Sequence, residues 1–347
     1  MLSNLAPSYH PFAMMSSTTI SLLAYAASVS ALLQQAPVGV PIEISKFGER
    51  PSWSPDGSKV AFMSKSYGDA LEYDVKTGDL DLLTSYPNAG YLRAQYLPNN
   101  DMFLIGAREF EDIETTRSTS EEMWVLPRGA NEAVALEHRI FEGVAISIRS
   151  NFIAWSNNHD QYPDRFPENI SAIYTADIVY NNGTPSLANQ REVIRAEAPA
   201  CILEPQDFRN NDTELIYSCY IINGKGLLGD VRGVYLETGE EVIYRHTPNE
   251  YNEVEGIYPS GKYALVESGH DSPAPNTTTY IDIWRMSLEP HSTDFVRLTY
   301  FSRDTPNKAG NPVVSPDGLM MAVARGRAGT QAGVGFGIYL IGLQTPE

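Results

Sequence analysis

The chain has 347 residues, of which 42% are hydrophobic and 20% are charged, so it can bury a sizeable core and is not expected to be disordered. Its 43 acidic and 25 basic residues give a formal charge of −18. This charge repels phosphate backbones and anionic lipid, so neither a nucleic acid nor a membrane surface is an expected partner.

The N-terminal segment predicts a signal peptide. Residues 20–33 read ISLLAYAASVSALL, an apolar run too short to span a bilayer, and Val29 and Ala31 are the small residues that a signal peptidase prefers. We therefore expect residues 1–31 to be removed, no membrane span to remain, and the chain to enter the secretory pathway or the extracellular space. The alternative is a buried N-terminal strand or helix.

Four sequons agree with passage through a secretory route, although Pro185 weakens the second of them. The expected glycosylation positions are Asn169, Asn182, Asn211 and Asn276.

A turn followed by an apolar run recurs six times along the chain, at spacings of roughly 40 to 60 residues. The best preserved copies read WSPDGSKVAFM (53–63) and VSPDGLMMAVA (314–324). The other copies are YLPNNDMFLIG (96–106), SIRSNFIAW (147–155), FRNNDTELIYS (208–218) and IYPSGKYALVE (257–267). Such a period indicates a radial repeat, because each small sheet can bury its faces only against its neighbours.

Each repeat is expected to hold four strands. Segments 69–85 and 233–247 each show two alternating runs joined by a Thr-Gly-acid turn, which is typical of a hairpin. The expected outermost strands lie in segments 79–85, 133–140, 190–197, 240–246 and 295–301. The sixth repeat ends with its third strand in segment 336–343, and the alternating segment 41–47 can supply its missing outer strand.

These features predict an all-β fold, a six-bladed β-propeller of four-stranded antiparallel blades. It would form a single domain over residues 38–347, with the last blade closed by the N-terminal strand so that few edges are exposed. The SPDG turns at 54–57 and 315–318, together with this closure, resemble the TolB-type β-propellers over residues 38–343. The resemblance implies the fold and no activity, because propellers host binding, lyase, hydrolase and scaffold roles alike.

The two cysteines flank a turn at residues 210–212, so an antiparallel hairpin would set Cys201 directly opposite Cys219. Given the predicted signal peptide, we expect a disulfide between them. Two buried free thiols are the alternative.

The SPDG turns are expected to close one face of the propeller. Polar residues shortly before each turn are expected to line the mouth of the central channel on the opposite face. These positions are Arg50, Arg93, Glu142, Glu204, Glu253, Glu255 and Asn311, with Tyr91 and Tyr251 just upstream of two of the turns. Each one alone is compatible with a solvated loop residue. As a ring of convergent polar groups around an apolar channel, they form a pocket hypothesis.

Two His-Asp pairs follow the second strands of the third and fifth repeats, in SNNHD and ESGHD. An imidazole oriented by a carboxylate can act as a general base or a metal ligand, so His159 and His270 are the acid/base candidates. TolB-type pectate-degrading lyases hold a metal through histidine, but no third histidine falls in an equivalent loop here. The one dinucleotide-like glycine motif is followed by a strand instead of a helix. We expect no metal and no other cofactor.

The architecture and targeting are similar to those of the hetero-Diels-Alderases of fungal tropolone-sesquiterpene pathways. That resemblance implies a cofactor-independent cyclase of secondary metabolism, with a small-molecule substrate held in the channel as a near-attack pair. Arg50 or Arg93 would donate a hydrogen bond to the developing oxyanion, and His159 or His270 would act as the base. The substrate-binding positions would be Tyr91, Glu204, Tyr251, Glu255 and Asn311.

Two other functions remain open: a non-catalytic glycan- or peptide-binding propeller, and a carbohydrate-active lyase or hydrolase in which Glu204 and Glu255 do acid/base work. Pocket shape distinguishes them, because a deep, aromatic, dry cavity favours the cyclase, whereas a groove lined with carboxylates favours sugar or peptide. The insert at 108–122 is predicted to be a mobile charged loop that could also act as a lid. The sequence leaves the oligomeric state open.

Overall fold

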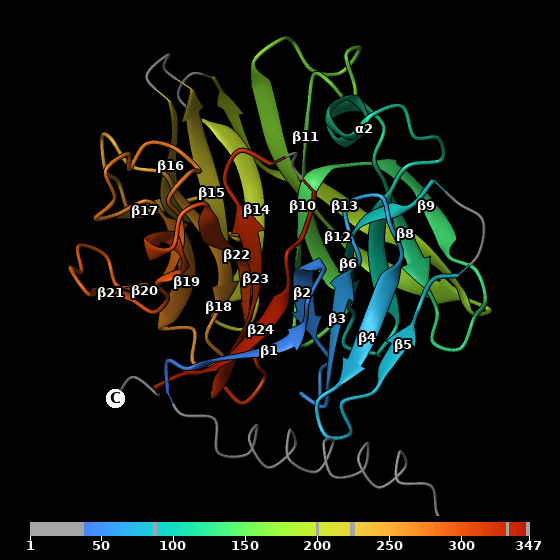
Figure 1. The fold of residues 1–347 in the computed structure, drawn as a ribbon. Coiled ribbons are helices and arrows are strands. Elements are labelled where there is room, and N and C mark those ends of the chain that lie inside the picture. Colours follow the sequence, from blue (N-terminus) through green and yellow to red (C-terminus); the bar gives the residue numbers. More distant parts are fainter. Residues whose placement is uncertain (1–37, 86–88, 199–200, 223–225, 331–332, 345–347) are drawn as a thin grey trace, which may run out of the picture.

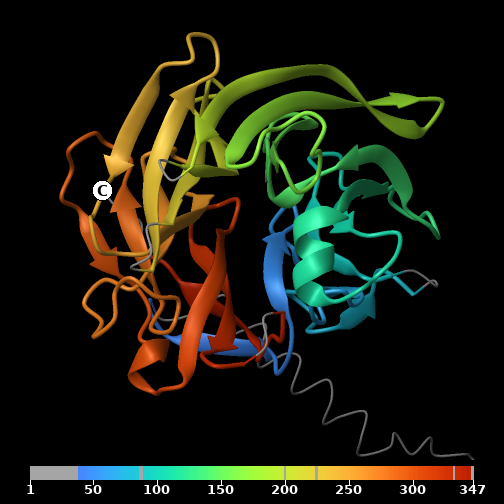
Figure 2. The same ribbon diagram turned by 90° about the horizontal axis from the view of Figure 1, so that it is seen from above.

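The chain folds into six four-stranded antiparallel sheets arranged as blades around one axis (Figures 1 and 2). A computed structural model describes residues 38–85, 89–198, 201–222, 226–330 and 333–344. The predicted signal peptide lies outside these residues. Within the described ranges, no helix is long and apolar enough to cross a membrane.

The first strand of each blade is the innermost. Blade 1 holds β2 (Glu49–Trp53), β3 (Lys59–Met63), β4 (Ala70–Asp74) and β5 (Leu80–Leu82), and blade 2 holds β6 (Tyr91–Tyr96), β7 (Met102–Gly106), β8 (Glu122–Leu126) and β9 (Val134–Arg139). Blade 3 holds β10 (Phe141–Ile146), β11 (Phe152–Asn158), β12 (Ile170–Asn181) and β13 (Thr184–Glu197), and blade 4 holds β14 (Ile202–Arg209), β15 (Glu214–Ile222), β16 (Leu227–Tyr235) and β17 (Glu241–Arg245). Blade 5 holds β18 (Asn252–Ile257), β19 (Tyr263–Ser268), β20 (Asp282–Ser287) and β21 (Phe295–Arg297).

Blade 6 joins the two ends of the described chain, as predicted. Its strands from the axis outward are β22 (Asn307–Val314), β23 (Met320–Arg327), β24 (Ile338–Gly342) and β1 (Pro41–Ser45). Ile42 of β1 pairs with Leu340 of β24 in antiparallel register. The ring therefore closes through backbone hydrogen bonds between segments almost 300 residues apart, and the predicted six-bladed fold is confirmed.

The two SPDG turns use the same hydrogen bonds. In blade 1 the Ser54 hydroxyl donates to Asp56 at 2.7 Å and accepts the backbone N–H of Lys59 at 2.9 Å. In blade 6 the Ser315 hydroxyl repeats both contacts. The glycine of each turn has φ of 70° to 75°, a region that glycine enters without steric cost.

The core lies between neighbouring blades, because alternate side chains of each strand point to opposite faces of its sheet. Phe103 and Ile105 of blade 2 pack in one cluster with Trp155 of blade 3, and Trp155 is fully buried. Each blade thus holds its neighbours in place, which makes the axial region rigid.

Cys201 and Cys219 form the predicted disulfide, with their Cα atoms 5.0 Å apart. They are not directly opposite, however, because Arg209 pairs with Glu214, which centres the turn between residues 211 and 212, and Leu203 lies across from Cys219. The bond therefore joins β15 to the residue just before β14.

The insert predicted to be a mobile loop contains the helix α2 (Ile113–Thr119). Asp112 caps its N-terminus by accepting the backbone N–H of Thr115 at 2.8 Å. The amide of Gln161, in the loop after β11, donates to the carbonyl of Ser118 near the helix end. The insert is therefore tied to blade 3, and α2 lies on one face of the ring (Figure 2). The 3-10 helix η1 (Phe301–Arg303) precedes β22.

Three of the predicted glycosylation positions, Asn169, Asn182 and Asn211, are exposed, whereas Asn276 is half-buried. All three exposed asparagines have positive φ, which is typical of turns. Their use as glycan acceptors stays a prediction.

Candidate active site

Two cavities lie at opposite ends of the six innermost strands. The upper chamber, on the face that carries α2, has a volume of about 570 Å³ and is lined by the early residues of these strands and by loops at that end. The lower chamber, of about 530 Å³, is lined by the turns that follow the same strands, including the SPDG turns of blades 1 and 6. The expectation that those turns close their face is therefore wrong. Glu255 lines both chambers.

The upper chamber is the predicted mouth, and ionisable side chains dominate it. Its carboxyl groups belong to Glu49, Glu142, Glu204, Glu253, Glu255 and Glu267. Its guanidinium groups belong to Arg50 and Arg93 of the innermost strands, Arg117 of α2, and Arg325 and Arg327 of β23.

A β-bulge interrupts every innermost strand. These bulges explain how the inner edge of each blade presents a side chain to the axis. The register shifts fall between Glu49 and Ser52, Tyr91 and Arg93, Phe141 and Val144, Pro205 and Asp207, Val254 and Gly256, and Gly310 and Val313. An extra residue bends its strand and re-aims the local side chains. The bulged residues that line a chamber are Arg50, Glu142, Gln206, Glu255 and Asn311. Of these, Arg50, Glu142 and Asn311 have positive φ, which is uncommon for residues with a Cβ.

Tyr220 joins two carboxyl groups from neighbouring blades. Its hydroxyl oxygen lies 2.8 Å from Oε2 of Glu204 and 2.5 Å from Oε1 of Glu253, while Tyr251 donates to the other oxygen of Glu253. A hydroxyl carries one proton and can donate to only one of the two carboxyl groups. The second contact is a hydrogen bond only if that carboxyl group is itself protonated, so the chain Glu204–Tyr220–Glu253 holds at least one acidic proton.

The surroundings of these groups favour that proton. Burial raises the pKa of Glu204, and the negative charge of Glu142 raises it further, although Arg93 acts in the opposite sense. Burial also raises the pKa of Glu253 well above its ordinary value, with additional repulsion from Glu255 and Glu267. At least part of this cluster is therefore protonated near neutral pH.

Glu255 has the opposite kind of environment. Its carboxylate lies 4.0 Å from a guanidinium nitrogen of Arg93 and accepts a hydrogen bond from Nδ2 of Asn311 at 3.2 Å. Burial lowers the pKa of Arg93, but Glu255, Glu204 and other nearby carboxylates outweigh this and raise it. Arg93 is therefore a permanent positive charge beside Glu255.

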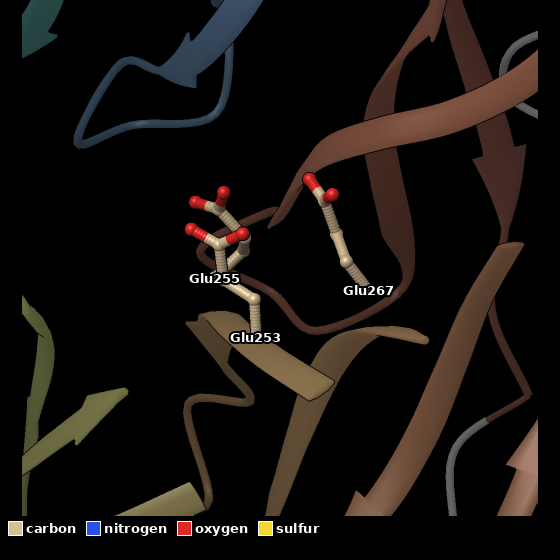
Figure 3. Close-up of side chains that lie close together, drawn as sticks. All are labelled: Glu253, Glu255 and Glu267. Carbon is tan, nitrogen blue, oxygen red and sulfur yellow. The ribbon is translucent and has the colours of Figure 1, made fainter. Parts of the chain in front are cut away.

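Three carboxyl groups meet at blade 5 (Figure 3). One oxygen from each of Glu253, Glu255 and Glu267 lies within 4.8 Å of the others, a donor set that a hard divalent cation can use. Each already accepts a hydrogen bond from the protein: Glu253 from tyrosine hydroxyls, and Glu255 and Glu267 from the side chain and backbone of Asn311. Proton sharing accounts for the cluster, and we assign no metal to it.

The helix α2 adds a cation that the sequence analysis placed in a mobile loop. Arg117 reaches the upper chamber and forms an ion pair with Glu142 of β10. Behind it, the fully buried Glu121 accepts a hydrogen bond from Tyr67 at 2.8 Å. Burial, with the charge of Glu142, raises the pKa of Glu121 to about 8.

The structure brings six of the nine predicted catalytic and substrate-binding residues into the upper chamber: Arg50, Arg93, Glu204, Tyr251, Glu255 and Asn311. Tyr91 does not line it, because its ring packs between blades 1 and 2 beside Ala61 and Met63. The sequence analysis counted it among the substrate-binding residues without the bulge between Tyr91 and Arg93, which places these two side chains on different sides of the strand.

The two histidines are also absent from the chamber lining. Nδ1 of His159 lies 2.8 Å from the carbonyl oxygen of Phe166 and closes the loop after β11. His270 faces Glu250 at 2.7 Å and packs edge-on against Trp284. Their positions after the second strands are equivalent in sequence, but local contacts hold both rings outside the chamber lining, so the predicted role as catalytic bases finds no support.

Tyr220, Glu267 and Arg117 are the functional candidates that the sequence analysis missed. Glu267 could have been found, because it pairs directly with Glu253 across the β18–β19 hairpin. Like charges directly opposite each other are unfavourable in a sheet unless something holds them there. A hairpin with two facing glutamates is therefore a signal of a site.

No protein-family model matches the chain, and no curated protein matches it. Among solved structures, the tricorn protease has a TM-score of 0.52 at 13% identity, over 88% of this chain and 27% of its own. TolB from Acinetobacter baumannii has a TM-score of 0.47 at 14% identity, over 85% of this chain and 68% of its own. An oligogalacturonate lyase in complex with manganese has a TM-score of 0.47 at 12% identity, over 85% and 77%.

The fold is that of a six-bladed β-propeller, which the tricorn protease shares. An identity of 13% shows the fold alone. Function has to be argued from the chamber itself.

Proposed function

We propose that the chain is an enzyme that cleaves glycosidic bonds by acid–base catalysis in the upper chamber. The observation that carries this proposal is the hydroxyl of Tyr220 between Glu204 and Glu253, which requires a protonated carboxyl group there. Glu255, beside Arg93, supplies a carboxylate in the same chamber. Glycoside hydrolysis needs these two states of one functional group, an acid for the leaving oxygen and a base for water.

In this mechanism Glu204 donates its proton to the glycosidic oxygen as the bond from that oxygen to the anomeric carbon breaks. Glu255 takes a proton from the attacking water, whose oxygen forms the new bond to the anomeric carbon. One water molecule is consumed, and the proton on Glu255 returns to Glu204 through solvent. General acid–base catalysis of this kind contributes about 10² to 10⁴ in rate.

Hydroxyl groups of a sugar fit the donors of the chamber. Arg50 and Arg93 line it, and a guanidinium group offers several N–H donors and no acceptor. Tyr251 and Asn311, already predicted to bind substrate, lie on the same wall.

The chamber favours this function over the cycloaddition suggested by architecture. Holding a diene and an alkene together requires mainly apolar surface, whereas six carboxyl and five guanidinium groups gather here beside the apolar residues. By the criterion of pocket shape stated above, a cavity lined with carboxylates points to a sugar or peptide. Proton donors and acceptors in opposite states favour cleavage over simple binding.

We further propose that the enzyme works in the secretory pathway or outside the cell. The disulfide between Cys201 and Cys219 supports this location, because such bonds persist mainly in oxidising compartments.

The test is the release of 4-nitrophenol from a panel of neutral and anionic 4-nitrophenyl glycosides. We expect at least one to be hydrolysed, and Glu204→Gln to reduce its kcat by at least about 10²-fold. Glu72→Gln is the matched control, since Glu72 also binds a tyrosine hydroxyl and a cation but lies outside the chamber. If every glycoside reacts equally fast with the wild type and Glu204→Gln, the proposal is wrong. Binding without turnover would point to the non-catalytic alternative.

A further inference from the structure

The upper chamber differs in charge from the rest of this acidic chain. The chain has a formal charge of −18, yet six acidic and six basic side chains line the chamber. The basic side chains are Arg50, Arg93, Arg117, Lys308, Arg325 and Arg327. The chamber is therefore neutral only when all six of its carboxyl groups are ionised.

Burial shifts this balance toward positive charge. It is the largest effect on the pKa of Glu204, Glu253 and Glu267 and raises all three, and repulsion from neighbouring carboxylates adds to it. Each proton that these groups hold leaves one basic side chain without a compensating charge. The chamber therefore carries a net positive charge near neutral pH, and its field attracts an anionic ligand.

Most of the basic side chains have a carboxylate partner. The pairs are Arg50 with Glu49, Arg93 with Glu255, Arg117 with Glu142, and Arg325 with Glu43. In the part of the chain that the structure describes, Lys308 and Arg327 form no such pair. Both belong to blade 6, on the paired strands β22 and β23. Blade 6 therefore presents two cations to the chamber that no carboxylate neutralises.

The side chain of Lys308 has a defined position. Its stem lies across Gly326 of β23, where a Cβ would come within 3.2 Å of the Cε atom of Lys308. Its ammonium group donates to the carbonyl oxygen of Thr278 at 3.0 Å, which uses only one of its N–H groups. Burial raises the pKa of Glu267, and the charge of Lys308 acts in the opposite sense, so Lys308 lies close to the carboxyl cluster.

Arg327 is exposed, and its guanidinium group lies over the ring of Phe336, 4.6 Å from the ring centroid. Stacking on a ring face leaves the N–H groups free, because they point outward in the guanidinium plane. Such groups bind the oxygens of a carboxylate or a sulfate through short, charge-assisted hydrogen bonds.

We propose that the substrate of the upper chamber is an acidic saccharide whose carboxylate or sulfate group binds to Lys308 and Arg327. The assignment of a sugar rests on the function proposed above. Glu204 belongs to blade 4, so the anionic group at blade 6 and the bond to be cleaved occupy different parts of the chamber. Lys308 and Arg327 bind and orient the substrate and take no part in the proton transfers.

The test is calorimetric titration of the full chain with three sugars of the same shape: methyl glucuronide, methyl glucoside 6-sulfate and the neutral methyl glucoside. We expect at least one of the two anions to bind at least about tenfold more tightly than the neutral sugar. The comparison of the two anions identifies the acidic group. Equal affinity for all three sugars would overturn the proposal.

Two variants assign the effect to blade 6. Lys308→Met keeps the stem and removes the charge, and it should weaken binding of the preferred anion about tenfold while leaving the neutral sugar unaffected. Arg327→Gln changes an exposed residue and covers the case in which Lys308→Met fails to fold. Lys262→Met is the matched control, since Lys262 is an exposed lysine outside the chamber lining. Anion binding that neither Lys308→Met nor Arg327→Gln weakens would also overturn the proposal.

The binding test is separate from the test of cleavage. Tight binding of an acidic saccharide that is not hydrolysed would reject the proposed reaction and keep the anion site. Hydrolysis of neutral glycosides without tighter binding of the anionic ones would keep the reaction and reject the anion site.

Discussion

Replacing Tyr220 with phenylalanine tests the proton chain directly. The substitution removes the hydroxyl between Glu204 and Glu253 and leaves the aromatic ring, which stacks on Tyr251 with ring centroids 6.4 Å apart. Hydrogen bonds to ionised groups contribute about 1.5 to 3 kcal/mol, and here one hydroxyl serves two carboxyl groups. A loss of about 1.4 kcal/mol at Glu204 corresponds to one pKa unit.

The direction of the change in the pKa of Glu204 follows from the role of the Tyr220 hydroxyl. Its hydrogen bond lowers the pKa of Glu204 by stabilising the ionised form, against the larger effect of burial, which raises it. Without the hydroxyl the pKa of Glu204 rises, so the proposed acid stays protonated to higher pH. We therefore expect the alkaline limb of the kcat/KM profile to move up by about one pH unit.

Tyr217→Phe is the matched control. Tyr217 lies on the same strand and donates to Glu241 at 2.6 Å, outside the upper chamber. It should lower the free energy of unfolding by about 1 kcal/mol without moving the pH profile. If the limb in Tyr220→Phe stays in place or moves to lower pH, the reasoning about the shared proton is refuted.

Three further predictions concern stability. Replacing both Cys201 and Cys219 with alanine should lower the free energy of unfolding by about 2 to 4 kcal/mol in urea titrations, and an unchanged midpoint would contradict this. The pKa of Glu121 is about 8 in the folded chain against an ordinary 4.5, so its contribution to the free energy of unfolding is complete below pH 4.5 and is lost as the pH rises to 8, by up to about 1.4 kcal/mol per pH unit. In urea titrations at pH 5 and pH 8, Glu121→Gln should show a smaller fall in the free energy of unfolding than the wild type. An equal fall in both proteins would refute this prediction. Deleting residues 38–45 removes β1 and exposes β24, so we expect aggregation in size-exclusion chromatography, and a stable monomer would count against ring closure as a source of solubility.

The fold could be predicted because its signals are local and repeated. The serine, aspartate and glycine of the turns at 54–57 and 315–318 predict the conformation of these turns. The sixth repeat lacks one strand, which only segment 41–47 can supply. The mouth residues followed from the fold, since their distance from each turn is nearly constant. What could not be read was the direction in which individual side chains point.

A β-bulge explains the failure at Tyr91. A bulge adds one residue to one strand and leaves no reliable mark in the sequence, yet it turns Tyr91 into the core. Cys219 does not lie opposite Cys201 because the turn is centred between residues 211 and 212, one to two residues later than expected. The prediction for the histidines fails for a different reason, because tertiary contacts such as that with Glu250 hold the ring of His270 outside the chamber. The helix in the charged insert was also not predicted, since the helix that follows the N-cap Asp112 is only two turns long.

The same bulges connect stability to chemistry. Arg50, Glu142 and Asn311 sit at positive φ, where a residue with a Cβ costs of order 1 kcal/mol or more, and each points a polar group into a chamber already crowded with charge. They persist because interblade packing, as between Phe103 and Trp155, holds the strands too firmly to relax. The rigidity of the ring is therefore what permits a cluster of carboxyl groups to remain close enough to share a proton.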